Sequence, residues 1–197
     1  DILVIHPISS AWCVYDPKNT NNNYITDLNN SFVSLSEILC NLHRDYDFGD
    51  EKLIAKYGKV DGSKFKIEKM EYKLIIIPPS ITLSDSTVKS LNKFVENGGK
   101  VVAIKPLPDR IDGKLDDSIS KFFTNKNVYL LDKAVLFNTK EMCSLKYLLD
   151  ELLAKDVEII DNDGNDIASI YYQHRQEGNL HIYFFANTDQ VNSFSAK

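Results

Sequence analysis

The sequence predicts an α/β protein, namely a flavodoxin-like three-layer sandwich with a mostly parallel sheet of about five strands, followed by an antiparallel β element. Short apolar runs alternate with segments of helical spacing, which is typical of βαβ units. A closed barrel of eight such units needs about 250 residues, and this chain has only 197. From Asp156 onward the pattern changes to strands and tight turns.

The first third of the chain supplies two strands and two helices. Residues 2–6 form an apolar run that ends at a proline, as in a strand buried on both faces. We expect a long polar loop after it. Apolar residues at helical spacing predict a helix over 25–43. A short strand at 46–49 and a short helix at 50–57 follow.

The middle of the chain is more regular. A small extended excursion is expected over 60–72, before a buried strand at 74–77 that stops at two prolines. Ser84 is a good N-cap for the next helix, and Gly98-Gly99 ends that helix because glycine accepts the left-handed conformation found there. Further strands are expected at 101–104 and 128–131, and further helices at 119–123 and 140–154.

The last part of the sequence predicts three strands joined by two tight turns. Asp163-Gly164 and Gly178-Asn179 are hairpin signals. We therefore divide the chain into an α/β domain over 1–155 and an antiparallel β-hairpin element over 156–197, which we interpret as the start of, or a link to, a β-domain. Because the chain opens directly in a strand without an initiator Met, we expect a module of a longer protein.

Composition excludes several classes of protein. The 43% hydrophobic content is too high for a disordered chain. A net charge of -5 argues against nucleic acid or an anionic membrane as the main partner. The three cysteines are widely spaced, so we expect reduced thiols and a cytoplasmic location, with Cys40 and Cys143 buried as small hydrophobes.

Several familiar binding and catalytic motifs are missing from the sequence. There is no glycine-rich dinucleotide fingerprint, no P-loop and no Gly-x-Ser-x-Gly elbow, so no cofactor is expected. A glutamine amidotransferase nucleophile would be a cysteine after the third strand, where this chain has Pro78-Pro79-Ser80. The Asp161 to Asp166 segment resembles a calcium loop only superficially, because its glycine and glutamate spacing is wrong. We expect a hairpin turn there and no metal.

The densest polar block is Asp45, Asp47, Asp50 and Glu51. It surrounds the end of a predicted strand, and ligands of open α/β sheets bind beyond the carboxyl ends of strands. Paired carboxylates suit glycoside hydrolysis or metal binding. The alternative is that Asp50 and Glu51 only favour the start of a helix, where the helix dipole attracts anions.

Three further candidates follow the first strand. His6, at its end, could act as an acid or base or could be bonded to the backbone. Trp12 and Tyr15 could stack on a sugar ring or could cover the edge of the sheet. These alternatives stay open at the level of sequence.

Ordered blocks of the chain resemble the region after the catalytic barrel in large alpha-L-rhamnosidase-like glycoside hydrolases. The blocks are 6–12, 43–51, 72–79, 94–99 and 172–187. The resemblance implies a flavodoxin-like, glutamine-amidotransferase-like domain, similar to the trimerisation domain of family 42 beta-galactosidases. In such enzymes the barrel carries the general acid and base, so no catalytic residue is carried over to this chain.

Three functions follow from these observations. The first is a non-catalytic accessory domain that packs on the barrel of a glycoside hydrolase and lines the carbohydrate cleft or an oligomer contact. The second is an independent carbohydrate or small-ligand binding domain, and the third is a free-standing hydrolase. The expected partners are the remaining domains of the parent enzyme, a carbohydrate or a second copy. The substrate-proximal candidates are His6, Trp12, Asp45, Asp47, Asp50 and Glu51.

Overall fold

A computed structural model describes residues 2–19 and 22–195. Its centre is a parallel five-stranded sheet with the order β11-β8-β6-β1-β2. This is the flavodoxin order, so the predicted fold class is confirmed. The strands are β1 (Ile2–Ile5), β2 (Tyr46–Gly49), β6 (Leu74–Ile77), β8 (Lys100–Ile104) and β11 (Val128–Leu131).

The central strands are buried on both faces. Every residue of β1 and β6 is at most 1% exposed. In β1, Leu3 and Ile5 point into one core, whereas Ile2 and Val4 point into the other. A strand with two apolar faces requires a helical layer on each side, which explains why the apolar runs in the sequence are continuous.

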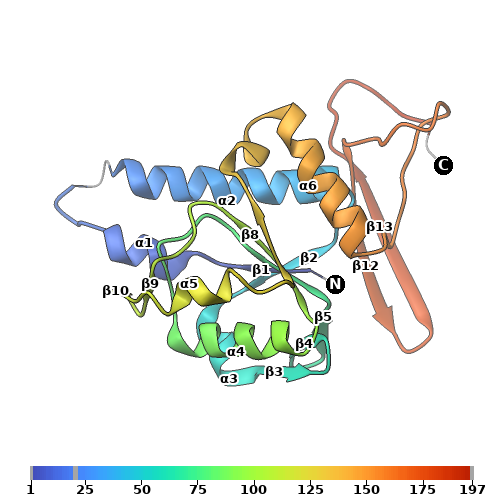
Figure 1. The fold of residues 1–197 in the computed structure, drawn as a ribbon. Coiled ribbons are helices and arrows are strands. Elements are labelled where there is room, and N and C mark those ends of the chain that lie inside the picture. Colours follow the sequence, from blue (N-terminus) through green and yellow to red (C-terminus); the bar gives the residue numbers. More distant parts are fainter. Residues whose placement is uncertain (1, 20–21, 196–197) are drawn as a thin grey trace.

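Helices cover both faces of the sheet, as Figure 1 shows. One layer contains α2 (Asn23–Asn41), the 3-10 helix η1 (Lys133–Leu136) and α6 (Thr139–Leu152). The other contains α3 (Glu51–Tyr57), α4 (Asp85–Glu96) and α5 (Ile119–Phe122). Polar side chains at Asn22, Asp50 and Ser84 accept backbone hydrogen bonds at the starts of α2, α3 and α4.

Two small sheets flank the central one. The predicted excursion is an antiparallel sheet of β3 (Gly58–Asp61), β4 (Lys64–Ile67) and β5 (Met70–Tyr72). The other sheet contains β7 (Thr82–Leu83), β9 (Arg110–Ile111) and β10 (Lys114–Leu115). No helix in the described part of the chain is both long and apolar enough to cross a bilayer.

The polar loop expected after β1 is instead the helix α1 (Ile8–Val14), so that prediction was wrong. Ser10 explains the difference. Its buried hydroxyl accepts the amides of Ile81 and Thr82, at 2.9 and 3.1 Å. A long-range contact therefore fixes α1, and short-range periodicity does not reveal it. Cys143 was also misplaced: it is exposed on α6, while Cys40 is half-buried.

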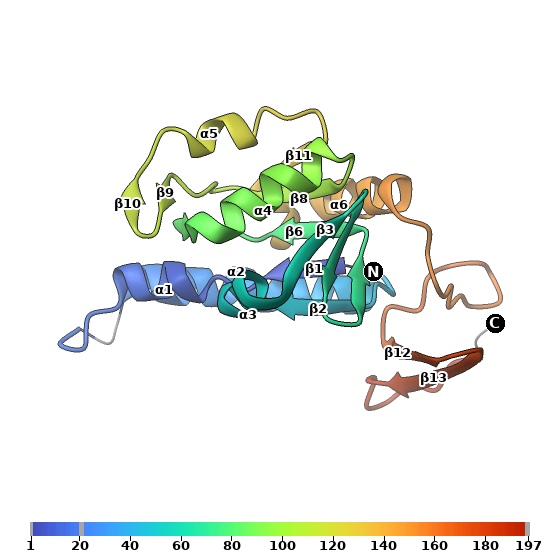
Figure 2. The same cartoon turned by 90° about the horizontal axis from the view of Figure 1, so that it is seen from below.

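The C-terminal element is a hairpin of β12 (Ile170–Glu177) and β13 (Leu180–Asn187). Its turn is Gly178-Asn179, as predicted, because Glu177 pairs with Leu180. The third expected strand is only an isolated bridge between Ile160 and Asp166. Figures 1 and 2 place the hairpin beyond the end of the sheet at which β1 begins.

Gly99 is a sensitive position in the core. A Cβ atom there would lie 2.3 Å from the ring of Phe94, which is fully buried against Phe65. We predict that Gly99→Ala lowers the free energy of unfolding by about 1–3 kcal/mol through overpacking. Urea denaturation measures this loss. Phe94→Leu in the same chain should recover part of it, and strict additivity of the two changes would contradict this explanation.

Candidate functional site

The carboxyl ends of the parallel strands form one candidate site. The strand order reverses between β1 and β6, and ligands of such sheets bind at this switch point. His6 follows β1 there. Its amide donates to the Gly49 carbonyl at 3.0 Å, and its half-buried ring meets Phe32 edge-on, with centroids 4.9 Å apart. The ring of His6 therefore belongs to an aromatic cluster beside the switch point.

Trp12 lies at the same edge, on α1, and lines a pocket of about 360 Å³. The indole is 60% exposed, and the Lys52 ammonium lies 5.1 Å from its ring centroid. Ser9 and Asp112 place polar atoms in the same pocket. Tyr15 is 59% exposed but does not line it. The edge thus offers an aromatic platform with hydroxyl and carboxylate groups beside it.

The acidic block after β2 is divided among separate structural contacts. Asp50 caps α3 by accepting the amides of Lys52 and Leu53. The Glu51 side chain is buried and accepts the Ser84 amide at 2.6 Å, which joins the starts of α3 and α4. These contacts match the helix-start alternative of the sequence analysis.

The other two acids of the block lie elsewhere. Asp47 accepts the hydroxyl of Tyr72 at 3.0 Å. Asp45 precedes β2, so it lies at the amino edge of the sheet, opposite Asp50. Burial raises the pKa of Asp45, and Arg175, 4.0 Å away, partly offsets this. The structure therefore does not bring the four acids into one site.

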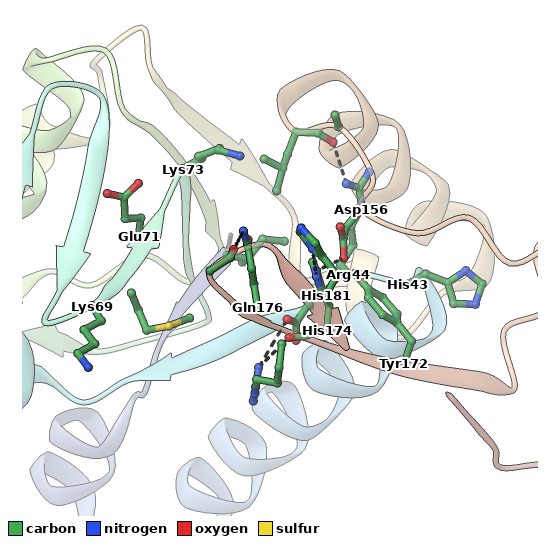
Figure 3. Close-up of a pocket in the computed structure, with 17 residues that line it drawn as sticks. His43, Arg44, Lys69, Glu71, Lys73, Asp156, Tyr172, His174, Gln176 and His181 are labelled. Carbon is green, nitrogen blue, oxygen red and sulfur yellow. Dashed lines mark hydrogen bonds and ion pairs between the residues drawn. The ribbon is translucent and has the colours of Figure 1, made fainter. Parts of the chain in front are cut away.

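A larger pocket lies at the amino edge, between the sheet and the hairpin, with a volume of about 610 Å³. Figure 3 shows its labelled side chains, which come from the segment after α2, from β5 and the residues beside it, from the segment after α6, and from β12 and β13. Its polar lining includes Arg44, Asp45, Asp156, Tyr172, His174, Arg175, Gln176 and His181. We call this cavity the hairpin pocket.

Asp156, His174 and His181 are joined in a row at the hairpin pocket. The Asp156 carboxylate lies 2.9 Å from His174 Nδ1, and His174 Nε2 lies 2.9 Å from His181 Nδ1. None of these three residues is among the site residues expected from the sequence. The strand register would have placed both histidines on one face of the hairpin. His181 pairs with Gln176, and Gln176 shares a face with His174 because side chains two positions apart on a strand point the same way.

Buried contacts at the end of α2 hold the base of the hairpin. Arg44 donates to the Leu153 carbonyl at 2.7 Å and forms an ion pair with Asp150. His43 Nε2 lies 3.0 Å from the Ile167 carbonyl, and burial lowers the pKa of His43. These bonds fix the segment that leads into β12, and therefore one wall of the hairpin pocket.

Among residues 2–19 and 22–195, no group of three or more His, Cys, Asp or Glu side chains is arranged to hold a metal ion. At the segment that resembles a calcium loop, Asp161 accepts the amides of Asp163 and Asn165, each at 2.9 Å. This is a side-chain-supported turn.

The family model for alpha-L-rhamnosidase matches residues 22–196. This chain belongs to the alpha-L-rhamnosidase family. It is therefore a domain related to glycoside hydrolases, as the sequence resemblance indicated. A search of curated proteins finds no match.

Among solved structures, this alpha-L-rhamnosidase-family chain is similar to the apo exo-carrageenase GH42 from Bacteroides ovatus. The TM-score is 0.53 at 10% sequence identity, and the match covers 95% of this chain and 22% of that chain. At this identity the likeness concerns the fold alone. The chain thus spans about a fifth of the length of that enzyme.

The bond between Glu51 and Ser84 gives a first test of the acidic block. We predict that Glu51→Ala lowers the free energy of unfolding by about 1–3 kcal/mol, because the Ser84 amide loses its acceptor. Glu51→Gln keeps an acceptor oxygen and should cost less. Urea denaturation measures both losses, with Glu96→Ala on the exposed face of α4 as the control. Equal losses for Glu51→Ala and Glu96→Ala would contradict this role.

Asp45 should make stability depend on pH. Its native pKa is raised from 3.8, so the folded chain holds this proton more tightly than the unfolded chain does. The resulting stabilisation is present below about pH 3.8 and is lost as the pH rises through the native pKa. Asp45→Asn carries no such proton. Relative to wild type, its free energy of unfolding should therefore rise as the pH increases through this window; urea titrations showing the opposite trend would refute the prediction.

Proposed function

We propose that this chain is a non-catalytic accessory domain of a multidomain glycosidase of the alpha-L-rhamnosidase family. In this proposal it packs on the catalytic barrel and lines the carbohydrate cleft with its carboxyl edge. The observation that carries the proposal is the use of Asp50 and Glu51 as backbone acceptors.

Glycoside hydrolysis usually needs two carboxyl groups that flank the scissile bond, one as acid and one as base or nucleophile. The acidic block does not offer such a pair. Glu51 is 5% exposed and bonded to Ser84, Asp50 caps a helix, and Asp47 is bonded to Tyr72. Asp45 lies at the other edge of the sheet. These positions support a structural role for the acids rather than a catalytic one.

The hairpin supports packing on another domain of the parent enzyme. On one face of β13, Leu180, Ile182 and Phe184 are 58%, 52% and 66% exposed. An isolated two-stranded hairpin is marginally stable in water, and a contiguous exposed apolar patch is typical of an interaction surface. The proposed occupant is the remainder of the enzyme, since the solved relative is more than four times as long as the matched region.

The second candidate function is an independent carbohydrate-binding domain. The exposed indole of Trp12, beside the pocket of about 360 Å³, favours it. Aromatic faces supply apolar area at low conformational cost, and the polar groups of Ser9 and Asp112 lie in the same pocket. The likeness to glutamine-amidotransferase-like domains, the cytoplasmic location and a contact with a second copy stay predictions.

Hydrolysis of an aryl alpha-L-rhamnoside tests the accessory role. We expect no hydrolysis above the buffer rate for this chain alone. In the full-length enzyme, Asp47→Asn should change kcat by less than about tenfold, whereas loss of a general acid or base costs about 10²–10⁴-fold. Hydrolysis by the chain alone that Asp47→Asn abolishes would overturn the proposal.

Trp12→Ala separates the two candidates. If the carboxyl edge lines the cleft, this change should raise KM in the full-length enzyme and leave kcat nearly constant. If the chain binds carbohydrate independently, calorimetry on the chain alone should detect L-rhamnose binding that Trp12→Ala removes. An unchanged KM together with no heat would remove Trp12 from both functions.

A further inference from the structure

We propose that the hairpin pocket binds a neutral saccharide, with His181 Nε2 accepting a hydrogen bond from a hydroxyl of the ligand. The pocket lies at the amino edge of the sheet, whereas the proposed function uses the carboxyl edge. The inference rests on that function only for the class of ligand, because a glycosidase-related domain meets saccharides. The volume of the hairpin pocket, about 610 Å³, is within the range of small-molecule sites.

The geometry of the two imidazoles identifies a hydrogen bond. Their near nitrogens are 2.9 Å apart, and their ring centroids are 5.1 Å apart with planes 24° from parallel. The centroid separation exceeds the nitrogen separation by about the sum of the two ring radii, so the nitrogens lie near the line joining the centroids. One ring must therefore donate directly to the lone pair of the other.

This arrangement differs from a metal clamp. Two imidazoles on one metal ion point their lone pairs at the ion along converging directions, whereas the lone-pair directions of His174 and His181 point at each other. The pair also belongs to no group of three or more His, Cys, Asp or Glu side chains that could hold an ion in the described part of the chain. The pair is thus a proton-ordered contact in the protein itself.

Asp156 determines where the protons lie in the neutral pair. A carboxylate only accepts, so His174 carries its proton on Nδ1, toward Asp156. His174 Nε2 is then a lone pair, and His181 must donate from Nδ1. The remaining nitrogen, His181 Nε2, is left as an acceptor. The network therefore selects the tautomer of His181, as a carboxylate does in other histidine relays.

Packing holds the relay in place. His174 stacks on Tyr183, with centroids 4.2 Å apart and planes 11° from parallel, and its side chain is only 16% exposed. His181 is exposed at the end of the row, on β13. Figure 3 shows Asp156, His174 and His181 together among the side chains of the pocket. A preorganised acceptor loses less entropy on binding than a free side chain does.

The neighbouring groups fit a neutral polyhydroxylated ligand. A sugar hydroxyl both donates and accepts, and the pocket offers both partners. The Arg175 guanidinium is a donor that is 56% exposed, and Gln176 uses its amide hydrogen on Gly178, which leaves its carbonyl oxygen as an acceptor.

The charges of the pocket are nearly balanced, because its lining holds the cations Arg44, Lys69, Lys73 and Arg175 and the carboxylates Asp45, Glu71 and Asp156. Arg44 is paired with Asp150 outside it, and Arg175 faces Asp45 at 4.0 Å. Asp156 is bonded to His174. The lining therefore has an excess of only one cation. A phosphate or a polyanion calls for several unpaired cations, so the lining favours a neutral ligand.

Histidine NMR on the whole chain tests this inference. Titration with L-rhamnose and with D-glucose should shift the His181 Nε2 resonance saturably at millimolar concentration. His181→Phe keeps an aromatic ring but has no acceptor, and it should weaken binding about tenfold or more. Lys59→Ala, on the exposed strand β3, is the matched control and should bind like wild type. The amide spectrum of each variant checks that it folds.

Three results would overturn the proposal: no shift with either sugar, equal binding by His181→Phe and wild type, or tighter binding of D-glucuronate than of D-glucose. A fourth such result is tight binding of Zn²⁺ that shifts the resonances of both histidines, because a metal clamp would then replace the relay. The test is independent of the proposed function. If the accessory role fails but the sugars still shift the His181 resonance, the hairpin pocket remains a saccharide site. If the isolated chain is inactive and the sugars cause no His181 shift, only the saccharide site is overturned.

Discussion

The constraint on which the structure depends is the double burial of the central strands. β1 has no polar side chain within it, and both its neighbours are parallel to it. Such a strand excludes water only if helices cover both faces, so the two helical layers follow from it. The same constraint directs function to the two edges of the sheet, because the faces are fully occupied by the two apolar cores.

At the carboxyl edge, polar groups are largely used to hold the layers together. Glu51 accepts the amide of Ser84, so a carboxylate at the start of one helix fixes the start of the next. Ser10 does the same for α1, through the amides of Ile81 and Thr82. An acidic block in a sequence can therefore reflect the needs of helix starts as well as those of catalysis.

Elements that depend on contacts between neighbours in the sequence could be predicted, whereas elements that depend on contacts between distant residues could not. The apolar run of Leu74 to Ile77 and the cap at Ser84 depend on neighbours in the chain, and both were found. α1 was missed because Ser10 bonds to residues more than 70 positions away. The Asp45 to Glu51 block was recognised as polar, but its division between two edges depends on the strand that lies between them.

The hairpin pocket was missed for a related reason. Asp156 and His174 are well separated along the sequence and form no known motif. Their contact requires the segment at Ile167 to be held by His43. Once Gly178-Asn179 sets the register, however, the position of His181 beside Gln176 is fixed.

The histidine relay and the exposed apolar face of the hairpin depend on each other. One face carries the relay and closes a pocket against the sheet, while the other exposes Ile182 and Phe184. A two-stranded sheet gains little stability from its own ladder, so its position depends on what lies against each face. Arg44 and His43 hold its base from one side. If the proposed function holds, a domain of the parent enzyme on the apolar face fixes the far end of the hairpin, and thereby the geometry of the pocket that the hairpin closes.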